Sequence, residues 1–235
     1  MEIFEHALQR ERKFMLKHQN AYDRALLQIR NRIGNLAGLV EERLCQAMSS
    51  LVQQDNILAG RILQGDDEVD SVVEALERDC LDLILLQQPT DSDLRFLSAA
   101  TRIGREMERI ADYACDIAEL TLELKQKVPY FKPLVDLPRM GEMVADMLRQ
   151  SIKVFLDQDL AGARRVVESD DPVDELFTAL LQELTDYMKK GPEYVDQASR
   201  LLLVARYLER IGDHVVNIAE MVVFIATGER HPFKS

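Results

Sequence analysis

The chain has 235 residues and a formal net charge of −12, with 47% hydrophobic and 30% charged residues. This acidity argues against nucleic acid as a partner, because nucleic acid recognition needs a basic surface. No run approaches the ~18 apolar residues of a membrane span, and three scattered cysteines without a CxxC pair suit a reducing cytosol. We therefore expect a cytoplasmic protein that neither inserts into a membrane nor binds nucleic acid.

Apolar residues recur at helical spacing along the chain, and the few Gly and Pro residues fall mostly between the periodic segments. A charged segment, 2–20, is expected to form a helix outside the repeated part of the chain. The predicted helices of the first half then follow at 22–53, 56–64, 66–87 and about 91–127. After a linker with Pro129, Pro133 and Pro138, the second half is predicted to contain helices at 140–157, 159–168, 170–190 and 193–227.

The second half of the chain repeats the first. Glu108-Arg109-Ile110-Ala111-Asp112 returns as Glu209-Arg210-Ile211-Gly212-Asp213, and Asp66 and Asp70 return as Asp170 and Asp174. The fold class predicted is therefore all-α, with two tandem three-helix bundles that arose by internal duplication. The expected domains are an N-terminal helical extension (1–24), a first repeat (25–128) and a second repeat (134–230).

The repeated segments are rich in carboxylates with a shared spacing. Glu108, Asp112 and Asp116 lie at i, i+4 and i+8 and therefore on one face of a helix. A turn at Pro89 would bring Asp66 opposite Asp112, and Asp70 opposite Glu108. In the second repeat, a turn at Gly191-Pro192 would place the corresponding residues together, which are Asp170 with Asp213 and Asp174 with Glu209.

Four carboxylates at one height of a helix hairpin repel one another unless nearby cations compensate them. Bound metal is one such cation, because hard metal ions prefer oxygen ligands. The predicted ligands form a first acidic cluster (Asp66, Asp70, Glu108, Asp112, Asp116) and a second acidic cluster (Asp170, Asp174, Glu209, Asp213, with Asn217 at the fifth position). The alternative is a solvated acidic surface balanced by Arg105, Arg109, Arg206 and Arg210, with Asp66 and Asp170 acting only as helix caps.

The sequence contains no recognisable enzyme motif. Ferritin-like di-iron enzymes place a Glu three residues before a His, and none of the four histidines here has one. No Ser–His–Asp set, Gly-rich phosphate loop or HExxH is visible either. We therefore expect no enzyme, although His214, next to Asp213, is a further candidate metal ligand.

Two segments, Met107–Tyr113 and Leu208–His214, resemble the repeated signature of the PhoU family of bacterial phosphate-uptake regulators. The resemblance spans about residues 30–227 and implies multinuclear clusters of iron or zinc on the acidic faces of two three-helix bundles. It also implies negative regulation of phosphate uptake and of the phosphate-starvation response. The partners implied are the ATPase subunit of the phosphate ABC transporter and the phosphate-sensing histidine kinase.

The resemblance alone does not fix the strength of the second metal site, the function or the oligomeric state. Asn217 stands where the first repeat has Asp116, so the second metal site is expected to be smaller or weaker than the first. A helical adaptor whose acidic faces bind a basic protein without metal is the main alternative function, and a redox or hydrolytic metalloenzyme is a third. The sequence leaves a homodimer open.

Overall fold

The computed structural model describes residues 2–87, 89–124 and 128–229, with side chains described from Ala21 onward, and this part of the chain contains α-helices and no strand. The all-α prediction is therefore confirmed. The first half contains α1 (Glu2–Gln53), α2 (Asn56–Gln64), α3 (Asp66–Gln87) and α4 (Asp91–Glu123). The second half contains α5 (Asp136–Asp157), α6 (Leu160–Glu168), α7 (Asp171–Lys190) and α8 (Pro192–Thr227).

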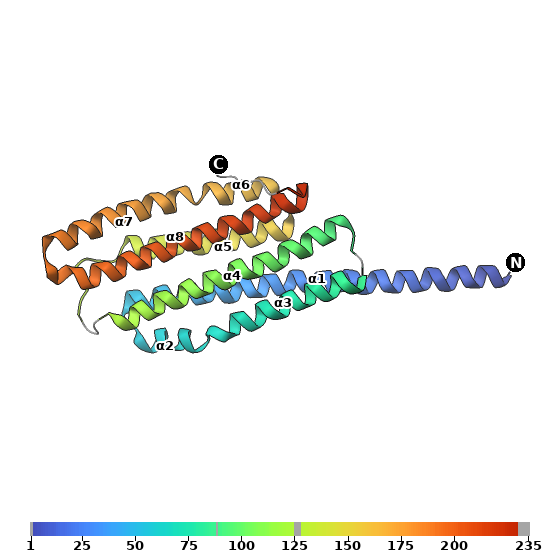
Figure 1. Cartoon of the computed structure of the whole chain (residues 1–235), viewed down its shortest axis with the longest axis horizontal. Helices are drawn as coiled ribbons and strands as arrows, with labels where there is room; N and C mark the ends of the chain where they lie inside the picture. The colour runs from blue at the N-terminus through green and yellow to red at the C-terminus, as the bar shows by residue number, and fades with distance from the viewer. Residues whose placement is uncertain (1, 88, 125–127, 230–235) are drawn as a thin grey trace.

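The two halves form three-helix bundles that lie side by side (Figure 1). In the first bundle α4 packs against α1, α2 and α3, and in the second bundle α8 packs in the same way against α5, α6 and α7. The bundles meet where α4 contacts α8 and where α1 contacts α5. Two contacts show that α4 and α8 run antiparallel, because the Tyr113 ring contacts the Tyr207 ring while Glu106 contacts His214.

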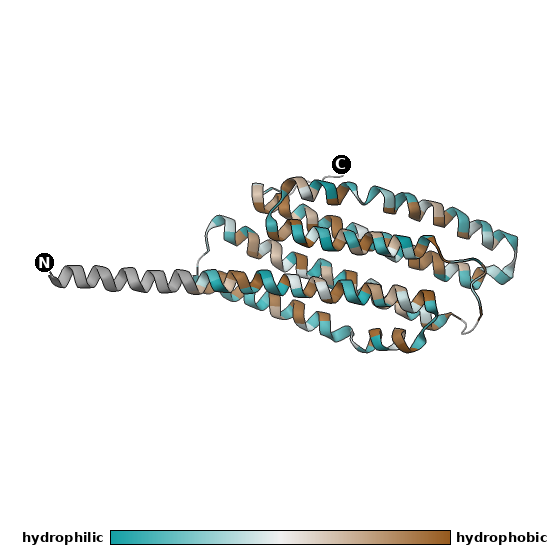
Figure 2. Ribbon diagram, turned by 180° about the vertical axis from the view of Figure 1, so that it is seen from behind, coloured by the Kyte–Doolittle hydropathy of each residue, from teal (hydrophilic) through white to brown (hydrophobic). Residues whose placement is uncertain are grey.

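Each helix carries a hydrophobic face and a hydrophilic face, visible in Figure 2 as alternating brown and teal along the ribbons. The buried face of α1 includes Ile29, Ile33 and Leu36, and Phe155 of α5 stacks on Phe96 of α4 with ring centroids 5.5 Å apart. Burying a side chain of this size contributes about 1.5–3 kcal/mol. The packing of amphipathic faces therefore supplies most of the stability of both bundles.

The helix boundaries agree with the sequence-based predictions at most turns. Asp55 caps α2 by accepting hydrogen bonds from the backbone N–H groups of Ile57 and Leu58, both at 3.0 Å, and Asp159 caps α6 in the same way through Gly162. Pro89 lies between α3 and α4, and Gly191 precedes α8, as predicted. These turns fix which residues of neighbouring helices face each other.

Two boundaries were predicted wrongly. The predicted break between an N-terminal helix and the first long helix does not occur, because α1 is continuous through this region. Pro138 was assigned to the linker but lies in the first turn of α5, where the N–H group that proline lacks would have had no helical partner anyway. The predicted end of α4 near Lys127 falls outside the described residues at 125–127, and α4 is described as far as Glu123.

The linker between the repeats is attached to both bundles. The Tyr130 hydroxyl donates a hydrogen bond to the Leu51 carbonyl of α1 at 2.5 Å, and the Phe131 N–H donates to Gln197 Oε1 of α8 at 2.9 Å. Lys132 forms an ion pair with Glu183 of α7. In the described part of the chain no helix combines the length and the apolar character needed to cross a bilayer.

Candidate metal-binding site

The α3–α4 hairpin brings the first acidic cluster together in the register predicted from the position of Pro89. The negative charges of Asp70 and Asp112 act on Glu108, and those of Asp66 and Asp70 act on Asp112. Asp116, one turn further along α4, experiences the charges of Asp112 and Asp66. Each of the five carboxylates therefore interacts electrostatically with at least one other, and the hairpin brings together residues that are far apart in the sequence.

Burial and mutual repulsion both make the charged form of this cluster unfavourable. Burial raises the pKa of Glu108, and the charges of Asp70 and Asp112 raise it further. Burial likewise raises the pKa of Asp112, although Arg109 at 3.2 Å partly opposes the shift. The pKa of Asp116 is raised by burial and by the charges of Glu119, Asp112 and Asp66. A cation bound here would relieve this repulsion.

Three carboxylates of the first cluster line an open hollow of 460 Å³, which is formed mainly by α4 and the start of α3. Its lining is mainly polar and includes Asp66, Asp112, Asp116 and Glu119, together with Arg109 and Tyr113. The Asp66 and Asp112 side chains are 51% and 40% exposed. The carboxylates are therefore accessible to ions from solution.

Two residues not identified from the sequence also contact this cluster. Arg43 of α1 is almost completely buried, and its guanidinium lies 3.6 Å from Asp66 Oδ1 and also donates to the Gly65 carbonyl. Cys115 Sγ donates a hydrogen bond to the same Asp66 oxygen at 3.1 Å, and burial together with this bond raises the pKa of the thiol to about 12. Arg43 was identifiable, because it lies seven residues after Leu36 on the apolar stripe of α1, where a charged residue is unexpected.

The second acidic cluster forms on the α7–α8 hairpin with a different arrangement. Asp174 and Asp213 act electrostatically on Glu209, whose pKa is raised chiefly by burial. Glu209 Oε2 is buried and accepts no hydrogen bond from the described residues, although Arg210 lies 3.8 Å away. Asp170 is completely buried, and its Oδ1 would clash with a Cβ at position 212, where the chain has Gly212. The interpretation of Asp170 as a helix cap is not supported, because its side chain makes no capping hydrogen bond.

Three of the four predicted compensating arginines do pair with cluster carboxylates. Arg109 contacts Asp112 at 3.2 Å, Arg210 contacts Asp213 at 3.3 Å and Arg206 contacts Glu209 at 2.6 Å. Arg105 instead pairs with Glu77 of α3. Because most of these side chains are substantially exposed, each pair contributes only modestly to stability.

Asn217 and His214 form part of the contact between the two bundles. Asn217 Nδ2 donates to Glu106 Oε2 of α4 at 3.1 Å, and His214 Nδ1 lies 2.7 Å from the same oxygen. Burial alone would raise the pKa of Glu106, but these two contacts outweigh it and leave the pKa below its usual value. Glu106 was not identified from the sequence, and the roles of Asn217 and His214 as metal ligands remain predictions.

The donor chemistry of both clusters fits a metal ion, although the side chains are not arranged around one. Among the described residues no three Asp, Glu, His or Cys side chains converge closely enough to hold a metal ion. Carboxylates with raised pKa values around an open hollow are nevertheless suitable oxygen donors for iron or zinc. Because the first cluster is partly exposed, its side chains have room to rotate toward an ion.

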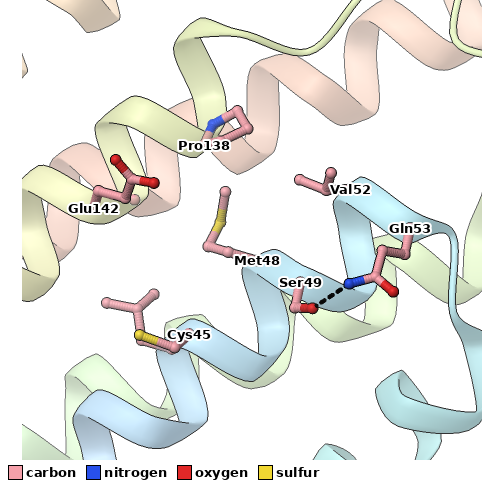
Figure 3. Close-up of a pocket in the computed structure, with 9 residues that line it drawn as sticks. Cys45, Met48, Ser49, Val52, Gln53, Pro138 and Glu142 are labelled. Carbon is pink, nitrogen blue, oxygen red and sulfur yellow. Dashed lines mark hydrogen bonds between the residues drawn. The ribbon is translucent and has the colours of Figure 1, made fainter.

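A second hollow, of 340 Å³, lies between α1 and α5 and has a different character (Figure 3). Its lining is largely apolar and includes Leu44, Met48, Val52 and Pro138. Glu142 is the one carboxylate among the lining residues, so this hollow lacks the donor set of a metal site.

Comparison with known proteins gives matches to both repeats. A model of the PhoU domain matches residues 33–121 and 137–222. The phosphate-specific transport system accessory protein PhoU homolog of Zymomonas mobilis is 37% identical over 212 residues, which cover 90% of this chain and 89% of that protein. A homolog of the same name from Aquifex aeolicus is 36% identical over 204 residues, covering 87% and 92%. The crystal structure of PhoU from Pseudomonas aeruginosa gives a TM-score of 0.83 at 28% identity, covering 88% of this chain and 100% of that one.

Proposed function

The chain belongs to the PhoU family, and from this we propose that it is a cytoplasmic, metal-binding negative regulator of phosphate uptake and phosphate-starvation signalling. Its relatives are named as accessory proteins of a phosphate transport system, so the chain is an accessory regulator rather than an enzyme. The observation that carries the metal-binding proposal is that carboxylates of both helices of each hairpin lie close enough to raise the pKa values of Glu108 and Glu209.

Bound metal would offset the electrostatic repulsion between the carboxylates of each hairpin. The proposed ligands are Asp66, Asp70, Glu108, Asp112 and Asp116 in the first cluster, and Asp170, Asp174, Glu209 and Asp213 in the second. Iron or zinc supplies positive charge when bound, and these residues come from both helices of a hairpin. Binding therefore ties α3 to α4 and α7 to α8.

The proposed action on partners is direct contact, and the α3–α4 turn offers a suitable surface. Leu81, Leu85, Leu86 and Leu94 are exposed there, with Leu85 and Leu86 both 76% exposed. In the second repeat Lys189 and Lys190 occupy the positions of Leu85 and Leu86, so the hairpin fold does not require leucines at this place. Exposed apolar groups without a structural purpose commonly mark protein interaction sites.

The contact proposal is tested by co-purification with the ATPase subunit of the phosphate ABC transporter and, separately, with the phosphate-sensing kinase. A Leu85→Asp/Leu86→Asp variant is expected to lose at least one of these partners. Leu181→Asp, on the exposed face of α7, is the matched control and is expected to bind normally. Undiminished binding of both partners by the double variant would exclude this surface, and absence of binding by the wild type would exclude direct contact.

A helical adaptor without metal is the second candidate. It is favoured by the arginine pairs at Asp112, Asp213 and Glu209, which already compensate part of the negative charge. Elemental analysis of protein purified without chelator separates the two functions. The metal-binding proposal predicts at least one equivalent of iron or zinc per chain, whereas the adaptor predicts background levels.

A further inference from the structure

The surroundings of the two acidic clusters differ, and the duplication allows them to be compared residue by residue. Helices α1 and α5 correspond with an offset of 104 residues, as the caps Asp55 and Asp159 show, and α4 and α8 correspond with an offset of 101 residues, as Glu108 and Glu209 show. Arg43 therefore corresponds to Met147, and Cys115 corresponds to Val216. Both counterparts in the second repeat are buried and apolar.

Arg43 directs its charge at the first cluster from inside the protein. Its side chain is only 6% exposed, and Nη1 lies 3.6 Å from Asp66 Oδ1 and 3.4 Å from the Asp66 carbonyl oxygen. Nη2 donates to the Gly65 carbonyl and lies 4.0 Å from Glu68 Oε2. Two backbone carbonyls thus hold the guanidinium in place, and a charge fixed in this way is screened less than one on a mobile surface arginine.

Asp66 and its counterpart Asp170 consequently have different surroundings. Asp66 is half exposed, and its Oδ1 is contacted by Arg43 and by the Cys115 thiol. Asp170 is completely buried, and Gly212 leaves the space that its carboxylate occupies, whereas the first repeat has Ala111 at that position. The same ligand position is thus open and bound to an internal cation in one repeat, and enclosed in the other.

We infer that Arg43 is an internal counter-cation of the first acidic cluster, which lowers the affinity of that cluster for metal. Arg43 repels an incoming divalent ion and competes with it for Asp66. The first cluster has one carboxylate more than the second, Asp116 in place of Asn217, and the positive charge of Arg43 offsets part of that difference. The difference in metal affinity expected from Asn217 alone, with the second site the weaker, is therefore reduced. This inference rests on the proposed metal binding.

The test measures Zn²⁺ binding to the first site alone, by calorimetry on the full chain with Asp213→Ala disabling the second site. Arg43→Met copies the second repeat, and Arg43→Gln keeps a donor for the Gly65 carbonyl while removing the charge. Both are expected to bind Zn²⁺ at least about tenfold more tightly, because a unit charge within about 5 Å of a divalent ion has an effect of this size even at high dielectric. Arg43→Lys retains the charge and is expected to stay close to the Arg43 parent.

The possible results separate the inference from the proposed function. Tighter binding by both neutral variants, with Arg43→Lys unchanged, supports the inference. Equal Zn²⁺ affinity in the parent and the neutral variants overturns the inference and leaves the proposed metal binding intact. Absence of Zn²⁺ binding in the parent and in every variant overturns both. A thermal melt of the metal-free proteins verifies that each variant is folded, and here the neutral variants should melt at lower temperature because Asp66 has lost its partner.

Discussion

Substitution of Gly212 by Ala tests the packing of the second acidic cluster most sharply. An Ala in a helix interior normally stabilises a protein by about 1 kcal/mol relative to Gly. At position 212, however, the added Cβ would collide with Oδ1 of the buried Asp170 carboxylate. Overpacking of a buried site costs about 1–3 kcal/mol, so after the gain from Ala we expect Gly212→Ala to be destabilising by up to about 2 kcal/mol overall.

Urea unfolding, followed by circular dichroism, measures this change as a shift in the unfolding midpoint. Gly38→Ala is the matched control, because Gly38 is an exposed position of α1 where an added Cβ meets no atom within 4 Å. That variant should be about 1 kcal/mol more stable than the wild type. In an Asp170→Ala background the collision is absent, so Gly212→Ala should become stabilising there. A Gly212→Ala variant that is stabilised as much as Gly38→Ala would show that a Cβ at position 212 does not collide with Asp170.

Three other predictions concern charge. Burial and neighbouring carboxylates raise the folded-state pKa values of Glu108 and Asp112. Protonation of these two groups therefore stabilises the folded protein. This contribution is fully present below their unfolded pKa values and is lost as the pH rises through the folded values. Metal-free wild type should therefore gain more stability between about pH 7 and pH 4 than Glu108→Gln/Asp112→Asn does in thermal melts, and an equal or larger gain in the variant would refute this. Asp116→Ala should reduce zinc-induced stabilisation more than Asn217→Ala does, because Asp116 lies with the first cluster whereas Asn217 binds Glu106. Equal losses of zinc-induced stabilisation would contradict the assignment of Asp116 as a metal ligand. Fluorescence anisotropy at about 0.15 M salt should detect no binding to duplex DNA, whereas salt-dependent binding at sub-micromolar concentration would contradict the acidic surface.

Much of the fold was predictable because the duplication marks corresponding residues. The positions of Pro89 and of Gly191-Pro192, combined with the helical spacing of the carboxylates, fixed the hairpin register that the structure shows. Only antiparallel neighbours separated by a short turn can be aligned in this way. The sequence therefore indicated which carboxylates of α3 face those of α4, and it also paired Asp174 of α7 with Glu209 of α8.

The contacts between more distant elements were not predictable by that reasoning. Arg43 reaches Asp66 from α1, and Glu106 reaches His214 and Asn217 across the interface between the bundles. Neither contact is fixed by the distance from a turn, because the relative rotation of packed helices depends on all the side chains between them. The continuity of α1 was also missed, because the charged composition of 2–20 does not itself end a helix.

The central claim, that the two acidic clusters bind metal, is tested most directly by a thermal melt with and without chelator. Wild-type protein stripped of metal should melt at lower temperature, and iron or zinc should restore the melting temperature. A ligand present at a hundredfold excess over its dissociation constant stabilises the folded state by about 2.7 kcal/mol. A variant with both Asp112→Ala and Asp213→Ala should be folded and should not respond to metal. If metal-free and metal-loaded wild type melt at the same temperature, after elemental analysis has verified both states, the acidic clusters are solvated surfaces and the account is wrong.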